Sequence, residues 1–211
     1  MILRNSLPDL SSVVRFFHAA AGAGPVDIYA NKKILIKNIS FSEMKPYIKL
    51  SPGEYTFEIY ETGTHETALF MDKITLLPNS ISTLCVVLLE SEITILKLKD
   101  GSTSKNPDLT LLRFINLSPN SPLLSLSPPN SETIFTGVEY LETTGYYPLS
   151  SGIFDFELTA TNDSSFRKYI GDLNLTSGTF YTIYILGLLD ESPRFGYYLS
   201  IDGEWKYEFR I

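Results

Sequence analysis

Apolar and polar side chains alternate along several short stretches of the chain, which is the spacing of a half-buried β-strand. Residues 54–59 place three apolar side chains on one face and three polar ones on the other, and residues 154–158 repeat the alternation. No stretch keeps the period of a helix, since the nearest candidate, residues 42–45, is followed by Pro46. The pattern predicts an all-β chain with at most one turn of helix.

Turn signals that contain Gly, Pro or Asn separate these stretches. In the first half of the chain the pattern predicts seven short strands, at residues 13–17, 26–29, 47–50, 54–59, 74–76, 81–89 and 93–98. So many short strands within about 85 residues are typical of a β-sandwich.

The second half of the chain repeats the pattern of the first with an offset of 98 or 99 residues. The matches are 14–16 with 112–114, 49–59 with 148–158, and 74–76 with 173–175. Three matches in nearly one register indicate two copies of one unit. Gly53 and Gly152 are predicted to occupy equivalent turns ahead of the fourth strand of each copy.

The repeat also predicts the domain organisation. It comprises an N-terminal segment (1–12), a first sandwich (13–100), a linker (101–109) and a second sandwich (110–211). The linker region is rich in Gly, Ser, Asn and Pro, which is typical of a connection between folded units.

Composition excludes several classes of protein. The 211 residues are 44% hydrophobic and 19% charged, which is globular rather than disordered. The net charge of −7 has the wrong sign for an electrostatic grip on nucleic acid, and no apolar run approaches the length of a membrane span. We expect no nucleic-acid partner and no membrane insertion. The start of the chain lacks a secretory signal pattern, which predicts a cytoplasmic location.

Two residues of the first copy could carry acid–base chemistry or bind a ligand. His18 follows the first predicted strand, and Asp27 could orient its imidazole. The favoured interpretation is that His18 bonds backbone of its own turn, as Asn116 could do in the second copy. Leu124 is aligned with Asp27, so the fold itself does not require the pair.

The other candidates for chemistry have structural interpretations. Cys85 is predicted to be buried and unreactive, and His65 to be solvated at a hairpin tip. Arg15 and Arg113 occupy equivalent strand positions, where pairing with a carboxylate is favoured over binding an anion. The sequence contains no zinc-ligand, phosphate-loop or serine-elbow motif, so we predict no catalytic residue, cofactor or metal.

Aromatic residues concentrated in the second copy form the candidate binding surface. They are Tyr146, Tyr147, Tyr197, Tyr198, Trp205 and Tyr207. Adjacent side chains on a strand point to opposite faces, so each tyrosine pair must send one ring outward or into an interface. Packing between domains or onto a partner is favoured over a carbohydrate platform.

Residues 17–29 (FHAAAGAGPVDIY), followed by Ser51-Pro52-Gly53-Glu54-Tyr55, resemble the bacterial family called domain of unknown function 4397. Members of that family open with a VRVVHASPDAPAVDVYVDG pattern and continue to L-x-x-G-x-Y. The resemblance implies tandem immunoglobulin-like β-sandwiches, often on exported or cell-surface proteins. It implies no established activity, substrate or catalytic residue.

The resulting hypothesis is a non-catalytic structural or interaction module. It would bind a protein or cell-envelope partner through its sandwich surfaces. The alternatives are a carbohydrate-binding module that uses the second-copy aromatic residues and, third, an enzyme that uses His18 and Asp27.

Overall fold

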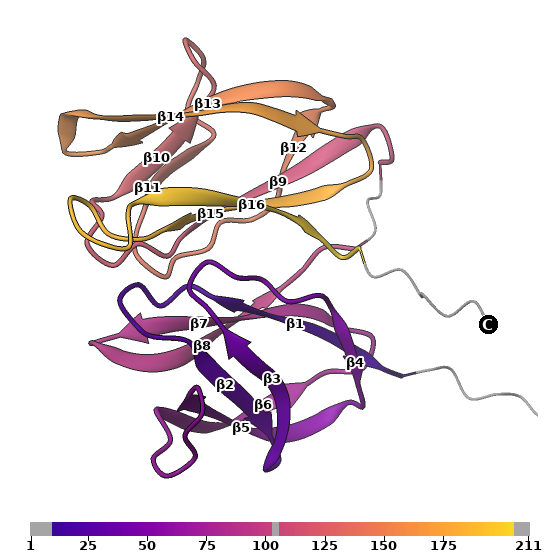
Figure 1. The fold of residues 1–211 in the computed structure, drawn as a ribbon. Helices are drawn as coiled ribbons and strands as arrows, with labels where there is room; N and C mark the ends of the chain where they lie inside the picture. Colours follow the sequence, from indigo (N-terminus) through magenta and orange to yellow (C-terminus); the bar gives the residue numbers. More distant parts are fainter. Residues whose placement is uncertain (1–9, 103–105, 205–211) are drawn as a thin grey trace, which may run out of the picture.

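The computed structural model describes residues 10–102 and 106–204, which form 16 β-strands and no helix (Figure 1). The strands of the first half are β1 (Ser12–His18), β2 (Val26–Ala30), β3 (Lys33–Ile39), β4 (Ile48–Leu50), β5 (Gly53–Glu61), β6 (Phe70–Leu76), β7 (Ile81–Leu89) and β8 (Glu92–Lys99). Those of the second half are β9 (Leu109–Asn116), β10 (Leu124–Ser127), β11 (Phe135–Val138), β12 (Tyr147–Ser150), β13 (Gly152–Ala160), β14 (Asp163–Leu175), β15 (Phe180–Leu186) and β16 (Gly196–Asp202).

Each half forms a sandwich of two four-stranded sheets with the same strand order. The orders are β4-β1-β7-β8 with β3-β2-β5-β6, and β12-β9-β15-β16 with β11-β10-β13-β14. One parallel pair occurs in each half, β1 with β7 and β9 with β15, and the other pairs between these strands are antiparallel. The prediction of an all-β chain built from two β-sandwiches is confirmed.

Each sandwich encloses its own core, which explains the alternation in the sequence. Phe57 and Ile59 point from β5 into the first core, where the ring centre of Phe57 lies 5.9 Å from that of Phe16. Phe156 and Leu158 occupy the same places on β13 in the second core. The polar side chains between them therefore face outward from the same strands.

The sequence pattern missed one strand of the first half, so the predicted count of seven is corrected to eight. β3 lies at a sheet edge and carries two lysines and an asparagine, which weakens its apolar signal. The turn before it places Asn31 and Lys32 at φ of 49° and 65°, the geometry of a tight hairpin that usually contains glycine. Gly53 and Gly152 begin equivalent strands as predicted, although these are the fifth strands rather than the fourth.

The connection between the halves runs from the end of β8 at Lys99 to the start of β9 at Leu109. The predicted linker 101–109 is shifted by one residue from this connection, which comprises residues 100–108. The domain boundaries themselves stay a prediction.

The two sandwiches pack against each other through the sheets that contain β1 and β7 in one half and β9 and β15 in the other (Figure 1). Phe16 faces its own core, whereas its neighbour Phe17 faces the other sandwich. The ring centre of Phe17 lies 4.9 Å from that of Tyr184 and 5.1 Å from that of Tyr198. Because both faces of these strands are covered, apolar side chains point to both of their faces instead of alternating with polar ones.

Tyr184 provides a test of this interface. Its hydroxyl is buried and has no hydrogen-bond partner among the described residues, which costs about 1–3 kcal/mol. We expect Tyr184→Phe to raise the free energy of unfolding by about 1 kcal/mol in urea titrations. Tyr181→Phe on the same strand is the matched control and should lower it, because the Tyr181 hydroxyl bonds Thr176. A loss of stability in Tyr184→Phe would contradict the conclusion that its hydroxyl is buried without a hydrogen-bond partner.

Candidate functional site

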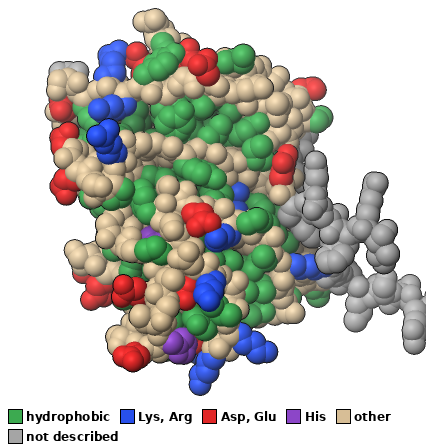
Figure 2. Space-filling model, viewed as in Figure 1, with side chains coloured by type: hydrophobic (Ala, Val, Ile, Leu, Met, Phe, Trp, Pro, Cys, Tyr) green, Lys and Arg blue, Asp and Glu red, His purple; other side chains and the backbone are tan. Residues whose placement is uncertain are grey.

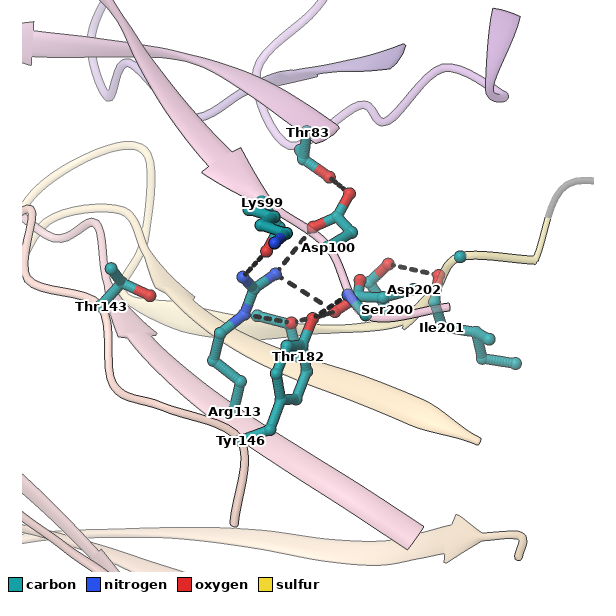
Figure 3. Close-up of polar contacts among 12 residues, drawn as sticks. Thr83, Lys99, Asp100, Arg113, Thr143, Tyr146, Thr182, Ser200, Ile201 and Asp202 are labelled. Carbon is teal, nitrogen blue, oxygen red and sulfur yellow. Dashed lines mark hydrogen bonds and ion pairs between the residues drawn. The ribbon is translucent and has the colours of Figure 1, made fainter. Parts of the chain in front are cut away.

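Two buried arginines and two buried aspartates form an ion cluster between the sandwiches, and Figure 3 shows its Arg113 side. Arg15 lies on β1 and Arg113 on the corresponding strand β9. The guanidinium of Arg15 donates to the Asp202 carboxylate, and Nη2 of Arg113 donates to Oδ1 of Asp100 at 2.8 Å. Each arginine therefore pairs with an aspartate of the other sandwich.

The remaining donors of the two guanidinium groups also have matching partners. The Nε atoms of Arg15 and Arg113 donate to the hydroxyls of Thr83 and Thr182, at 2.7 and 2.9 Å. Their Nη1 atoms donate to the backbone carbonyls of Ile201 and Lys99, both at 2.8 Å. The cluster thus has approximate two-fold symmetry that relates one half of the chain to the other.

Each guanidinium also lies over a tyrosine ring, 4.5 Å from the ring centre for Tyr47 and 4.7 Å for Tyr146. The two hydroxyls donate to Asp100 and Asp202 at 2.8 and 2.6 Å. Burial raises the pKa of both tyrosines above the ordinary value, so they stay protonated donors. The prediction that the strand arginines pair with carboxylates is confirmed, and the cluster clamps the two sandwiches together.

His18 and Asp27 bind different partners and do not form a pair. Nε2 of His18 donates to the carbonyl of Gly24 at 3.0 Å, so the predicted bond to its own turn is confirmed. Oδ1 of Asp27 accepts from the backbone N–H of Asn38 at 2.7 Å, and Oδ2 accepts from that of Gly63 at 3.3 Å. Both side chains are buried and hold loops in place.

The second sandwich shows that these are structural positions. Asn116 bonds its own turn, donating to Ser121 at 2.9 Å. The counterpart of Asp27 is Ser125 rather than the predicted Leu124, because Asp27 pairs with Tyr60 and Ser125 with Thr159 in the same register. The Ser125 hydroxyl accepts from the N–H of Gly137 at 3.0 Å, as Asp27 does from Asn38.

Burial lowers the pKa of His18, which gives its role a pH signature. A folded-state pKa below the unfolded value of about 6.5 contributes stability above that pH, which is lost as the pH falls. Nδ1 has no partner among the described residues, so protonation would bury an unsatisfied N–H. We expect His18→Asn to lose less thermal stability than the wild type between pH 7.5 and 5.5.

The measurement is the melting temperature at the two pH values, with His65→Asn as the control because His65 is exposed. That control should keep the pH dependence of the wild type. An unchanged pH dependence in His18→Asn would contradict the burial account.

Cys85 is fully buried between the sandwiches, and burial raises the pKa of its thiol. The predicted burial is confirmed. We expect an aromatic disulfide reagent to label Cys85 slowly in the folded protein and rapidly in denaturant. Labelling at equal rates in both conditions would contradict this and would make the thiol a candidate nucleophile.

The six candidate aromatic residues lie in different parts of the structure. Tyr146 lies in the ion cluster, and Tyr198 packs on Phe17 across the interface. Tyr147 and Tyr197 lie at the two edges of their sheet, on the face that covers the second core, where they are 45% and 43% exposed. The other ring of each tyrosine pair lies in the interface, which is one of the two predicted placements. Trp205 and Tyr207 lie outside the described residues.

The two exposed rings do not form one platform. Tyr147 lies on β12 and Tyr197 on β16, the opposite edges of one four-stranded sheet. Three strand spacings, about 14 Å, separate these edges.

An open pocket on the outer face of the first sandwich was not predicted from the sequence. A hollow of about 570 Å³ lies on sheet β3-β2-β5-β6, and the residues that line it include Asn31, Lys32, Thr56, Glu58, Tyr60 and His65. His65 is exposed, but its ring packs on that of Tyr60, with centres 4.2 Å apart and planes 26° apart. A signal for the pocket was present in Tyr60, an aromatic residue on the polar face of its strand.

Glu58 lies at the base of this pocket and is only 4% exposed. Its carboxylate accepts from the hydroxyl of Tyr60 at 2.8 Å. Within residues 10–102 and 106–204, no Lys, Arg or His nitrogen lies within 4.0 Å of it. The pocket therefore presents a buried carboxylate beside aromatic side chains.

The described residues contain neither a metal-binding cluster nor a membrane-spanning helix. No group of three or more His, Cys, Asp or Glu side chains is placed to hold a metal ion. None of the described segments is a helix that could cross a membrane.

Comparison with known proteins identifies the family of the chain. No curated protein matches the chain. Residues 12–127, more than half of the chain, match the family described as "Domain of unknown function (DUF4397)". The match includes the whole first sandwich together with β9 and β10. The resemblance seen in the sequence is thereby confirmed, and the chain belongs to the DUF4397 family.

Proposed function

We propose that the chain is a non-catalytic interaction module that engages a protein partner through the pocket on its first sandwich. The proposal rests on a difference between the two halves, which otherwise have the same strand order. Tyr29 and Tyr60 flank Glu58 in the first half, and their counterparts in strand register are Ser127 and Thr159. Since the second sandwich forms without these rings, the fold does not require them.

The residues that could perform chemistry support the same proposal. His18 bonds the backbone of its own turn and Asp27 bonds backbone groups of neighbouring segments. Their counterparts Asn116 and Ser125 bond backbone groups in the same way. Cys85 packs between the sandwiches. These side chains are used by the fold, whereas the Glu58 carboxylate faces an open hollow.

A carbohydrate ligand is the alternative, with Tyr147 and Tyr197 as the exposed rings. Their places on opposite sheet edges favour two separate contacts over a sugar platform. For a nucleic-acid partner there is no support, because acidic and basic side chains are interspersed on the face drawn in Figure 2 and the net charge is −7. An immunoglobulin-like relationship of the sandwiches and a cell-envelope partner are further proposals that rest on the family resemblance.

Site-specific photo-crosslinking in the native host tests the proposal. A photoreactive amino acid at Met71, on the rim of the pocket and 59% exposed, should yield a discrete crosslinked protein. The matched control is Tyr169, which is 62% exposed and pairs with Glu157 as Met71 pairs with Glu58. We expect no discrete product from that position.

Absence of a specific product from Met71 would overturn the proposal. Glycan-array binding that is lost in Tyr147→Ala or Tyr197→Ala would favour the carbohydrate alternative instead.

A further inference from the structure

One pair of equivalent carboxylates has different partners in the two sandwiches. Glu58 pairs with Tyr29 across β5 and β2, and Glu157 pairs with Ser127 across β13 and β10, so the two glutamates hold the same place in the sheet. Oε2 of Glu157 accepts from Nη1 of Arg167 at 2.9 Å. Thus the second sandwich supplies a guanidinium to this carboxylate from its own strand β14.

Among the described residues of the first sandwich, no such cation lies within 4.0 Å of Glu58. The position equivalent to Arg167 is Leu69, which is apolar. Arg167 immediately precedes the strand partner of Leu158, and Leu69 immediately precedes the strand partner of Ile59. Glu58 retains the Tyr60 hydroxyl as a donor, although an ionised carboxylate can accept about four hydrogen bonds. Burying a carboxylate without a counter-cation costs free energy of folding, and binding of a cation offsets part of that cost.

We propose that the pocket binds the guanidinium group of an arginine side chain on the partner. This inference rests on the proposed function and specifies its chemistry. A planar guanidinium forms charge-assisted bonds to a carboxylate and stacks on aromatic rings, and the pocket offers both kinds of group in Glu58 and Tyr60.

The surroundings of the pocket fit such a ligand. The hollow of about 570 Å³ has room for an arginine side chain together with adjoining backbone. Residues 62–69 connect β5 to β6 and carry His65, which packs on Tyr60, whereas most of the corresponding residues 161–167 of the second sandwich extend the strand β14. In the first sandwich this segment therefore adds a ring to the wall of the pocket. Lys32, at the rim, is exposed, so solvent and salt screen its charge.

The first test is an NMR titration with N-acetyl-arginine methylamide, observed at the histidine ring protons. The chain has two histidines, and His18 is buried away from the pocket, so His65 reports on the site. We expect saturable shifts at His65 and none at His18. The citrulline analogue has the same shape but no charge and should bind at least about tenfold more weakly.

Variants locate the binding group. Glu58→Gln should weaken binding of the arginine derivative about tenfold or more. Glu54→Gln is the matched control, because Glu54 lies on the same strand and pairs with Lys73 outside the pocket, and its affinity should not change. His65→Ala alters an exposed loop and removes the ring that reports on the site, so its affinity is measured by isothermal titration calorimetry instead. It should also weaken binding, so the test holds even if Glu58→Gln folds poorly.

Equal binding of the citrulline analogue, or an absence of shifts at His65, would overturn the guanidinium assignment. Saturation by a methyl glycoside in place of the arginine derivative would overturn it in favour of a sugar. A positive titration without a crosslinked protein at Met71 would leave the chemistry of the pocket standing and reject the protein partner. The two proposals can therefore fail separately.

Discussion

Asp202→Ala is expected to lower the free energy of unfolding by about 3–5 kcal/mol, because it leaves buried guanidinium charge without its partner. Asp202 contacts both Arg15 and Arg113 and also accepts from Thr182. Urea unfolding followed by circular dichroism measures the change. The exposed Asp72→Ala should stay within about 0.5 kcal/mol of the wild type.

The source of this loss can be checked with a second substitution. Adding Arg15→Met to Asp202→Ala removes one of the unpaired charges, so the double variant should be more stable than the sum of the two single losses implies. Strict additivity, or a loss below about 1 kcal/mol in Asp202→Ala, would show that the cluster is not a clamp between the sandwiches.

Phe17→Ala is expected to cost about 3–5 kcal/mol, the usual range for a deleted core ring. The ring is fully buried between the sandwiches, where it contacts Tyr184 and Tyr198. Phe16→Ala removes a neighbouring ring that is equally buried but lies inside the first sandwich, and it should cost a similar amount. The exposed Met71→Ala should have little effect.

This comparison tests whether the interface is as well packed as a domain core. Denaturant titrations of the variants provide the values. A loss near zero for Phe17→Ala beside a full loss for Phe16→Ala would mean that the sandwiches touch only loosely in solution.

Much of the fold could be predicted because apolar and polar residues alternate along individual strands. The inward residues Phe57 and Phe156 stand out against polar neighbours, and their spacing exposes the likeness of the halves. β3 escaped because its outward residues include lysines and its turn contains no glycine. The misplaced counterpart of Asp27 came from a one-residue shift that only strand pairing reveals.

The ion cluster and the pocket are tertiary features, and this limited what the sequence could predict. Arg15 and Arg113 were recognisable as equivalent, but Asp100 and Asp202 stand 102 positions apart, outside the register of 98 or 99. Their pairing also crosses between sandwiches, which no local pattern encodes. Tyr60 and His65 come together through a loop whose path is not apparent from residue spacing.

The most direct test of the account is the yield of crosslinked partner from the Met71 position in two backgrounds, Glu58→Gln and His18→Asn. The pocket account predicts that Glu58→Gln abolishes the product and that His18→Asn retains it, since His18 only closes its own turn. A product that survives Glu58→Gln but disappears in His18→Asn would contradict the account and return the functional site to His18.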